Sequence, residues 1–303
     1  MKRATLILAT LALLAWAVAA PPAHAEFLFV SNVGNGTISE VTPSGSVSTF
    51  ASGFSSSPVG LAFNASGDLF VSNSANGSIS EVTPSGSVST FASGFDGPAG
   101  LAFNASGDLF VTNRNNGTIS EVTPSGSVST FASGFNDPYG LAFNASGNLF
   151  VSNIGNGTIS EVTPSGSVST FANGFDGPTG LAFNASGDLF VLNNSNGKIS
   201  EVTPSGSVST FASGFNNNSN GLAFNAGGDL FVTNGNNGTI SEVTPSGSVS
   251  TFASGFNGPY GLAFQPNIPP PSAVPEPSSL TLLALGVATL AGYRWRRRKL
   301  TPA

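Results

Sequence analysis

The chain has 303 residues and a formal net charge of −6, and it contains no cysteine and a single histidine, His24. The lack of cysteine excludes disulfide bonds and a cysteine nucleophile, and one histidine is too few for a zinc site of the usual kind. Between Glu26 and Gln265, two basic residues against 14 acidic ones give a net charge of −12. This segment lacks the basic surface that nucleic-acid binding requires.

The first 25 residues have the pattern of a secretory signal peptide. Lys2 and Arg3 precede an apolar run over 4–20, and Ala23-His24-Ala25 forms a small-x-small cleavage pattern. We expect cleavage after Ala25; an uncleaved N-terminal membrane anchor is the alternative. Cleavage removes the only histidine, so the mature chain has no imidazole for a Ser-His-Asp system.

Near-copies of one unit of about 40 residues follow, from Phe27 to Phe264. The string EVTPSGSVSTFA begins at six positions, at spacings of 41, 40, 40, 40 and 41 residues: Glu40, Glu81, Glu121, Glu161, Glu201 and Glu242. A fixed period of this length is typical of repeat architectures.

Each unit predicts four short strands. In the unit at 60–95, runs rich in Val, Ile, Phe and Thr cover 60–63, 68–72, 78–82 and 87–92, and turn-forming Asn, Gly, Ser and Pro separate them. Six such antiparallel units predict an all-β fold, a six-bladed β-propeller with four-stranded blades. An open β-solenoid is the alternative. The phenylalanines of this unit are expected to fill the cores between blades: Phe63, Phe70, Phe91 and Phe95.

The two ends of the repeat region predict a closed ring. The segment 27–30 matches the second strand of the unit, and the segment 261–264 matches the first. Half a blade is therefore expected at each terminus, and pairing of these strands would complete the sixth blade and remove exposed sheet edges. The predicted propeller domain spans residues 26–265.

The unit resembles an NHL repeat. The matching segments are Gly100-Leu101-Ala102-Phe103, Gly107-Asp108-Leu109-Phe110-Val111 and Asn115-Asn116-Gly117. The resemblance implies a propeller related to those of the gluconolactonases and strictosidine synthases. Where such repeats often have Asp after the second strand, this chain has Asn in every unit: Asn32, Asn73, Asn113, Asn153, Asn193 and Asn234.

Differences among the copies concentrate at one end of the predicted propeller. The turns of the other end are almost identical, whereas the second hairpin and the loops between blades vary. This variable face is the candidate binding surface, with relaxed drift in loops as the alternative. Its candidate residues include Arg114 and the loop tyrosines Tyr139 and Tyr260. A tyrosine ring stacks on sugars or peptides and its hydroxyl forms hydrogen bonds, although packing against Pro138 and Pro259 would also explain both.

The carboxylates favour structural roles. Asp68 and its counterparts Asp108, Asp188 and Asp229 occupy a near-invariant turn, which we expect them to organise through bonds to the backbone. Glu40 and its five equivalents lie inside the third strand, where solvent-edge or inter-blade positions are expected. Only Asp96, Asp137 and Asp176 fall in the variable loops.

The alternative enzymatic function is a lactonase-like hydrolase resembling the gluconolactonases, with a divalent cation such as calcium in the channel. Asn220-Gly221-Leu222 matches an Asn-Gly-Leu segment of that family, and Asn234 follows in the same unit. Amides help to ligate a hard cation but supply neither negative charge nor a general base. We therefore predict no catalytic residues, no resident metal and no required cofactor.

The C-terminal segment predicts a sorting tail. Six prolines among residues 265–277 indicate a stiff linker, assigned to 266–279. Pro275-Glu276-Pro277, a short apolar helix and an Arg/Lys cluster within 280–303 resemble the PEP-CTERM sorting signal of Gram-negative bacteria, which implies recognition by an exosortase-type enzyme. The apolar stretch at 280–293 is short for a membrane span, so we expect transient anchoring in the inner membrane, with a permanent anchor as the alternative.

These features together predict an exported protein at the cell surface or outside the cell. The predicted function is that of a non-catalytic β-propeller that binds extracellular polysaccharide or a surface protein, or that serves as a rigid spacer. Arg114, Tyr139, Asn220, Asn234 and Tyr260 are its candidate binding residues.

Overall fold

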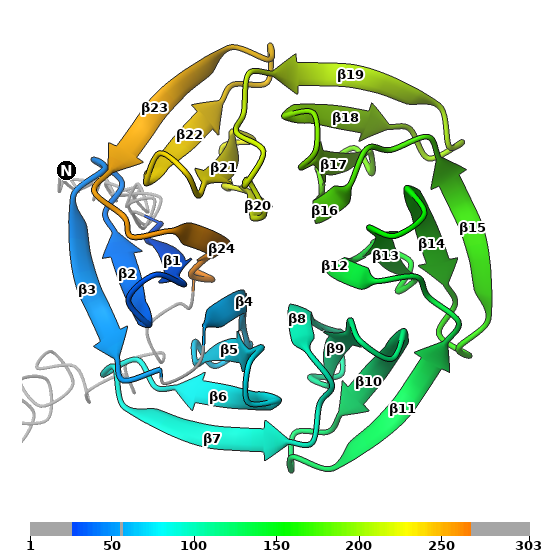
Figure 1. Cartoon of the computed structure of the whole chain (residues 1–303), viewed down its shortest axis with the longest axis horizontal. Helices are drawn as coiled ribbons and strands as arrows, with labels where there is room; N and C mark the ends of the chain where they lie inside the picture. Colours follow the sequence, from blue (N-terminus) through cyan, green and yellow to red (C-terminus); the bar gives the residue numbers. More distant parts are fainter. Residues whose placement is uncertain (1–25, 55–56, 268–303) are drawn as a thin grey trace, which may run out of the picture.

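The structure, a computed structural model, describes residues 26–54 and 57–267. Six four-stranded antiparallel sheets are arranged as blades around a central axis, as Figure 1 shows. The all-β six-bladed propeller is thereby confirmed. Residues 1–25 and 268–303, which hold the predicted signal peptide, most of the linker and the tail helix, lie outside the described residues. No helix within the described part of the chain is long and apolar enough to cross a membrane.

The strands fall into four concentric positions in the blades. The innermost strands are β4 (Pro58–Phe63), β8 (Pro98–Phe103), β12 (Pro138–Phe143), β16 (Pro178–Phe183), β20 (Leu222–Phe224) and β24 (Pro259–Phe264). The second strands are β1 (Leu28–Asn32), β5 (Leu69–Asn73), β9 (Leu109–Asn113), β13 (Leu149–Asn153), β17 (Leu189–Asn193) and β21 (Leu230–Asn234). The third strands are β2 (Thr37–Val41), β6 (Ser78–Val82), β10 (Thr118–Val122), β14 (Thr158–Val162), β18 (Lys198–Val202) and β22 (Thr239–Val243). The outermost strands are β3 (Val47–Ser52), β7 (Val88–Ser93), β11 (Val128–Ser133), β15 (Val168–Asn173), β19 (Val208–Ser213) and β23 (Val249–Ser254).

The ring closes through the two ends of the repeat region. Strand β24 pairs antiparallel with β1, with Leu28 opposite Phe264 and Val30 opposite Leu262. The Gln265 amide also donates a hydrogen bond to the Phe27 carbonyl at 2.9 Å. Closure is confirmed, but the expected half-and-half division is wrong: the N-terminus supplies three strands of this blade and the C-terminus one.

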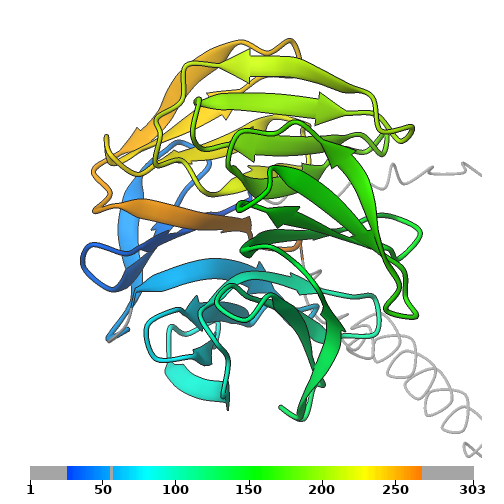
Figure 2. The same ribbon diagram turned by 45° about the vertical axis from the view of Figure 1, so that its right-hand side comes forward.

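Neighbouring blades lie side by side around the ring (Figure 2), and the clusters of buried apolar side chains each combine residues of two adjacent blades. Phe29 of β1 contacts Phe50 of β3 edge-to-face at 4.8 Å between ring centroids, and Phe63 of the next blade at 5.1 Å. Equivalent triads recur around the ring, for example at Phe70, whose partners lie at 4.9 and 5.0 Å. Such edge-to-face pairs contribute beyond the burial of their area, so the repeated phenylalanines hold adjacent blades together.

The turn between the first and second strands is organised by asparagine rather than by aspartate. The side-chain oxygen of Asn64 accepts hydrogen bonds from the amides of Ser66 and Asp68, both at 2.9 Å. The Asp68 carboxylate accepts a hydrogen bond from the Asn64 amide at 3.0 Å. This corrects the expectation that Asp68 bonds to the backbone, because the Asn side chain already occupies the turn amides.

A buried hydroxyl connects each blade to the next at the inner end of most seams. The Ser72 hydroxyl accepts a hydrogen bond from the Gly60 amide at 2.8 Å and donates one to the Ala99 carbonyl of the neighbouring blade at 2.6 Å. Four other blades repeat this connection, through Ser31, Thr112, Ser152 and Thr233. Leu192 stands at the sixth position. The seam between the blades of β17 and β21 therefore lacks this bond.

Candidate functional site

Six equivalent residues, here called the ring positions, precede the Gly-Leu-Ala-Phe segments of the innermost strands. In five units the ring position follows a proline, and in the sixth it follows Ser219. The ring positions are Val59, Ala99, Tyr139, Thr179, Asn220 and Tyr260. Three of them pack together although they come from three different blades: Val59, Ala99 and Tyr139. The expectation that Tyr139 and Tyr260 lie in loops is wrong, because the innermost strands begin one residue earlier, at a proline.

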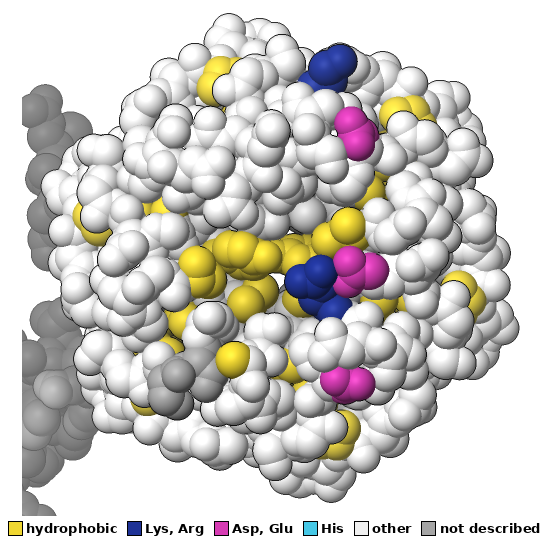
Figure 3. Space-filling view, viewed as in Figure 1, with side chains coloured by type: hydrophobic (Ala, Val, Ile, Leu, Met, Phe, Trp, Pro, Cys, Tyr) yellow, Lys and Arg dark blue, Asp and Glu magenta, His cyan; other side chains and the backbone are white. Residues whose placement is uncertain are grey.

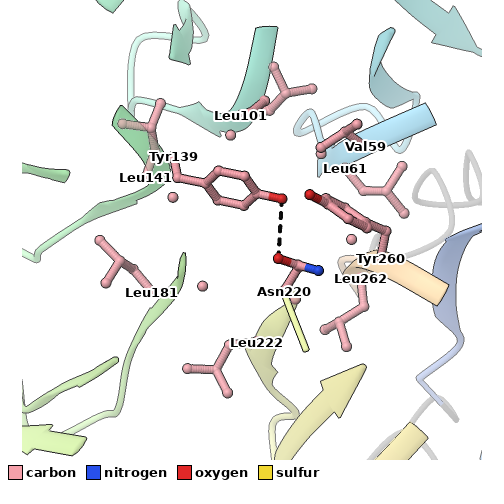
Figure 4. Close-up of a pocket in the computed structure, with 17 residues that line it drawn as sticks. Val59, Leu61, Leu101, Tyr139, Leu141, Leu181, Asn220, Leu222, Tyr260 and Leu262 are labelled. Atoms are coloured by element: carbon pink, nitrogen blue, oxygen red, sulfur yellow. Dashed lines mark hydrogen bonds between the residues drawn. The ribbon is translucent and has the colours of Figure 1, made fainter. Parts of the chain in front are cut away.

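Tyr139 is a buried member of this ring, with 5 % of its surface exposed. Its hydroxyl donates a hydrogen bond to the side-chain oxygen of Asn220 at 3.4 Å, as Figure 4 shows. Burial, and then the neighbouring Tyr260 hydroxyl, raise the pKa of Tyr139 well above its ordinary value of 10.0. Tyr139 is thus a neutral structural element of the site, and its ring is not free to receive a ligand.

Arg114 covers the outer side of Tyr139. The guanidinium carbon lies 5.0 Å from the centre of the tyrosine ring, within the range of a cation–π contact. Both Asp137 oxygens accept hydrogen bonds from this guanidinium, at 2.8 and 3.1 Å. The side chains of Arg114 and Asp137 are each 34 % exposed. The positive charge of Arg114 is therefore balanced locally and held in a fixed position.

Asparagine side chains form the other side of the site. The Asn194 amide donates hydrogen bonds to the side-chain oxygen of Asn220 at 2.9 Å and to the Ser219 carbonyl at 3.1 Å. The Asn220 amide in turn donates to Asn218 at 3.3 Å. Asn194 is one of the positions that vary among the copies in the second hairpin, but it was not among the candidate binding residues.

Tyr260 faces Tyr139 across the axis. The ring centroids lie 6.2 Å apart and the ring planes are inclined by 48°. Tyr260 is half-buried and packs, together with Ile154, against the cluster formed by Val59, Ala99 and Tyr139. Figure 3 shows this end of the channel as a hollow with hydrophobic side chains on its floor and charged side chains at its edge. We call this region the channel mouth.

Below the mouth, the channel is narrow and apolar. Its cavity has a volume of about 80 Å³, which is well below the 300–1,000 Å³ typical of small-molecule sites. Leucines of the innermost strands line it, for example Leu61, Leu141 and Leu262. The channel therefore has room for a few water molecules or for one edge of a ligand.

Asn234 does not belong to the mouth. It is 5 % exposed, and its amide donates a hydrogen bond to the Ser241 hydroxyl at 2.9 Å. Its oxygen accepts a hydrogen bond from the Ser219 hydroxyl at 3.4 Å. Asn113 behaves similarly, since its amide donates to Ser120 at 2.8 Å. The asparagines that end the second strands thus fasten the hairpins of their own blades.

The channel residues do not fit a divalent cation of the lactonase type. The cavity is lined by glycine, alanine, valine, leucine, tyrosine and asparagine, with no carboxylate among them. The Asn220 oxygen already accepts hydrogen bonds from Tyr139 and Asn194. Among residues 26–54 and 57–267, no three His, Cys, Asp or Glu side chains gather closely enough to hold a metal ion.

Two sequence profiles match the chain. The profile of the virginiamycin B lyase family matches residues 15–174, which is more than half of the 303 residues. The PEP-CTERM protein-sorting motif matches residues 273–299 and includes Pro275, Glu276 and Pro277. This motif indicates export and surface sorting, and implies recognition by an exosortase. No curated protein sequence matches the chain.

Solved structures share the fold at low sequence identity. A catalytically inactive histidine-to-alanine variant of virginiamycin B lyase from Staphylococcus aureus, with quinupristin, is 17 % identical, with a TM-score of 0.61, over 81 % of this chain and 94 % of that one. A chain of a nidogen/laminin complex has a TM-score of 0.70 at 18 % identity, over 79 % and 98 % of the two chains. A gluconolactonase from Xanthomonas campestris has a TM-score of 0.62 at 16 % identity, over 76 % and 84 %. Enzymes and a protein of a binding complex thus share one architecture.

Proposed function

The chain belongs to the virginiamycin B lyase family, and we propose that it is an exported, surface-sorted member that acts as a non-catalytic module, binding extracellular polysaccharide or protein or serving as a structural element. The family includes enzymes, so the proposal rests on the chemistry of the channel rather than on the fold. The observation that carries it is that the polar groups near the axis are already engaged with one another. Tyr139, Asn194 and Asn220 form one hydrogen-bonded set.

Hydrolysis or elimination needs a group that takes up or delivers a proton. The S. aureus lyase variant described as catalytically inactive has lost a histidine, and residues 26–303 of this chain contain no histidine at all. The channel cavity also lacks carboxylates. The only ionisable side chain at its floor besides Tyr260 is Tyr139, and its raised pKa keeps it protonated at neutral pH. The carboxylate of Asp137 at the edge of the mouth is paired with Arg114, so our proposal assigns no general base to the mouth.

An activity assay tests this proposal. We expect the purified mature chain, residues 26–303, to show no saturable lactone hydrolysis and no streptogramin cleavage, with or without added Mg²⁺ or Ca²⁺. Turnover that is lost in Asn220→Ala or Asn234→Ala would refute the non-catalytic assignment. Ser66→Ala, on the opposite face, is the control for a contaminating enzyme.

The sorting part has a separate test. We propose that an exosortase recognises Pro275-Glu276-Pro277 and that the tail holds the protein at the inner membrane at least transiently, in a Gram-negative host. Deletion of 274–303 should move the protein from the membrane and surface fractions into the periplasm or medium. Replacing Glu276 with alanine isolates the motif from the apolar stretch. An unchanged distribution after the deletion would remove the sorting assignment.

A further inference from the structure

The channel mouth is divided into an apolar and a polar side. Val59, Ala99 and Ile154 pack with the two tyrosine rings on one side. On the other side lie Asn194 and Asn220. Both amide hydrogens of Asn194 are used within the protein, by the Ser219 carbonyl and the Asn220 side-chain oxygen. Among the described residues no donor bonds to the side-chain oxygen of the half-buried Asn194, which leaves this oxygen as a hydrogen-bond acceptor at the mouth. A pyranose ring is divided in the same way, because its C–H faces are apolar and its hydroxyl edges donate and accept. The mouth and a sugar therefore match in the kind of group that each side presents.

The charges of the mouth favour a ligand without charge. The single guanidinium there, that of Arg114, already has both Asp137 oxygens as partners and lies over the Tyr139 ring. Residues 26–265 carry a net charge of −12, so a polyanion is repelled on approach. Asp137 uses two of the five N–H donors of Arg114, and its negative charge beside the remaining donors disfavours a uronate, sulfate or phosphate group there.

The mouth lies at the end of the propeller opposite to the chain ends. Strand β24 begins next to Tyr260 at the mouth and runs to Phe264 at the far end of the blade. There, the hydrogen bond between Gln265 and Phe27 holds the two termini of the propeller together. The described part of the chain therefore ends on the face opposite the mouth.

From these observations we propose that the channel mouth is a binding site for a neutral glycan, with Tyr260 as the stacking surface and the Asn194 side-chain oxygen, which the bond to Asn220 holds in place, as an acceptor for a sugar hydroxyl. This assignment rests on the proposed non-catalytic function and gives it a ligand class. Tyr260 is half-buried, so part of its ring is accessible to a sugar, whereas Tyr139 and Arg114 hold the surroundings in place. The cavity of about 80 Å³ below the mouth admits one edge of a sugar residue, such as a hydroxymethyl group.

Affinity electrophoresis and calorimetry with the mature chain test the proposal. The probes are two neutral glucans, dextran and laminarin, the anionic polysaccharide alginate, and a pool of unstructured peptides. We expect at least one neutral glucan to bind and alginate not to bind. Tyr260→Ala should weaken binding about tenfold, the size of effect that loss of one aromatic contact gives. Tyr260→Phe should retain most of the affinity, because it keeps the stacking surface.

Two further variants separate a binding defect from a folding defect. Asn194→Ala removes the proposed acceptor together with two hydrogen bonds to the next blade. It should weaken binding severalfold and lower the thermal midpoint by only a few degrees, and binding is measured well below that midpoint. Ser66→Ala, an exposed position on the opposite face, should bind as the wild type does. Equal losses in Ser66→Ala and Tyr260→Ala would overturn the site.

The remaining outcomes also decide the matter. Binding of alginate alone, or of peptides alone at the mouth, would overturn the ligand class, and so would failure of both neutral glucans to bind. Surface fractionation and the lactone assay are measured independently of glycan binding. Failure of glycan binding would therefore leave the exported, non-catalytic function standing. Glycan binding together with lactone turnover or unchanged fractionation would instead refute that function and keep the glycan site.

Discussion

The substitution Ser72→Ala removes only one hydroxyl group, but we expect it to destabilise the propeller strongly. This buried hydroxyl accepts from the Gly60 amide and donates to the Ala99 carbonyl, so it connects two blades through two hydrogen bonds. Each bond has a net worth of about 0.5–1.5 kcal/mol, and a buried partner that is left unpaired costs about 1–3 kcal/mol. Since both partners lose their bond in Ser72→Ala, we expect a loss of about 2–4 kcal/mol in the free energy of unfolding.

Urea unfolding followed by circular dichroism measures this loss directly. At this chain length, 1 kcal/mol corresponds to roughly 2–4 °C, so the thermal midpoint should fall by about 5–15 °C. The matched control is Thr112→Ser, which removes a methyl group and keeps the hydroxyl that bonds to Gly100 and Tyr139. A change below about 0.5 kcal/mol in Ser72→Ala, or an equal loss in Thr112→Ser, would refute the importance of the hydroxyl.

Three other changes test separate parts of the structure. Tyr139→Phe should abolish a loss of stability above pH 10, because the unfolded chain releases its tyrosine proton there while the raised pKa of buried Tyr139 retains it; the urea midpoint against pH shows whether that slope exists and disappears. Gly140→Ala should destabilise by about 1–3 kcal/mol, since the new methyl group would collide with the Thr179 carbonyl of the next blade; a higher melting temperature would contradict the close approach. The Asn148 amide donates a hydrogen bond to the Glu161 carboxylate at 2.7 Å, and Asn148→Asp replaces this donor with a second negative charge. We expect the free energy of unfolding to fall by about 1 kcal/mol at pH 7 and by less at pH 4, where carboxylates begin to be protonated. A loss that does not depend on pH would show that charge is not its cause.

The sequence was sufficient to predict the fold because its information is repeated. Each of the six units predicts four strands, and the two terminal segments complement each other. A closed ring is the arrangement in which every blade is complete. The pairing of Leu28 with Phe264 confirms that reasoning. The three-to-one division of the closing blade was also readable, since Phe27 precedes a second strand, but it was described as half and half.

Strand boundaries were the weaker part of the prediction. The predicted first strand begins at the glycine of the unit, as at Gly60, and therefore leaves the preceding proline, such as Pro138, outside the strand. The structure places it within β12. Strand β12 is the innermost strand and has an unpaired edge, where proline is tolerated. The two tyrosines, which follow such prolines, were therefore assigned to loops when they are strand residues near the axis.

Contacts between side chains across the axis could not be predicted from the sequence. Tyr139 and Asn220 are separated by 81 positions and meet only because the blades curve into a ring. The pairing of Arg114 with Asp137 likewise depends on the path of a loop between blades. Repetition predicts which positions are equivalent, but it does not predict which side chains at those positions make contact.

The departures from repetition gather at one seam, and this bears on where function resides. Leu192 interrupts the series of inter-blade hydroxyls, the neighbouring strand β20 has three residues where its counterparts have six, and the loop before Asn220 differs from the others. These departures remove the Ser/Thr hydroxyl connection of the other seams. Bonds from Thr179 and Asn194 to the Ser219 carbonyl, and from Asn194 to Asn220, cross this seam instead. Asn194 and Asn220, the polar side of the mouth, lie there. The seam where the chain departs from its repeated contacts is thus the one that brings these two amides to the mouth, and a departure from an otherwise consistent pattern is expected where a protein has a functional site.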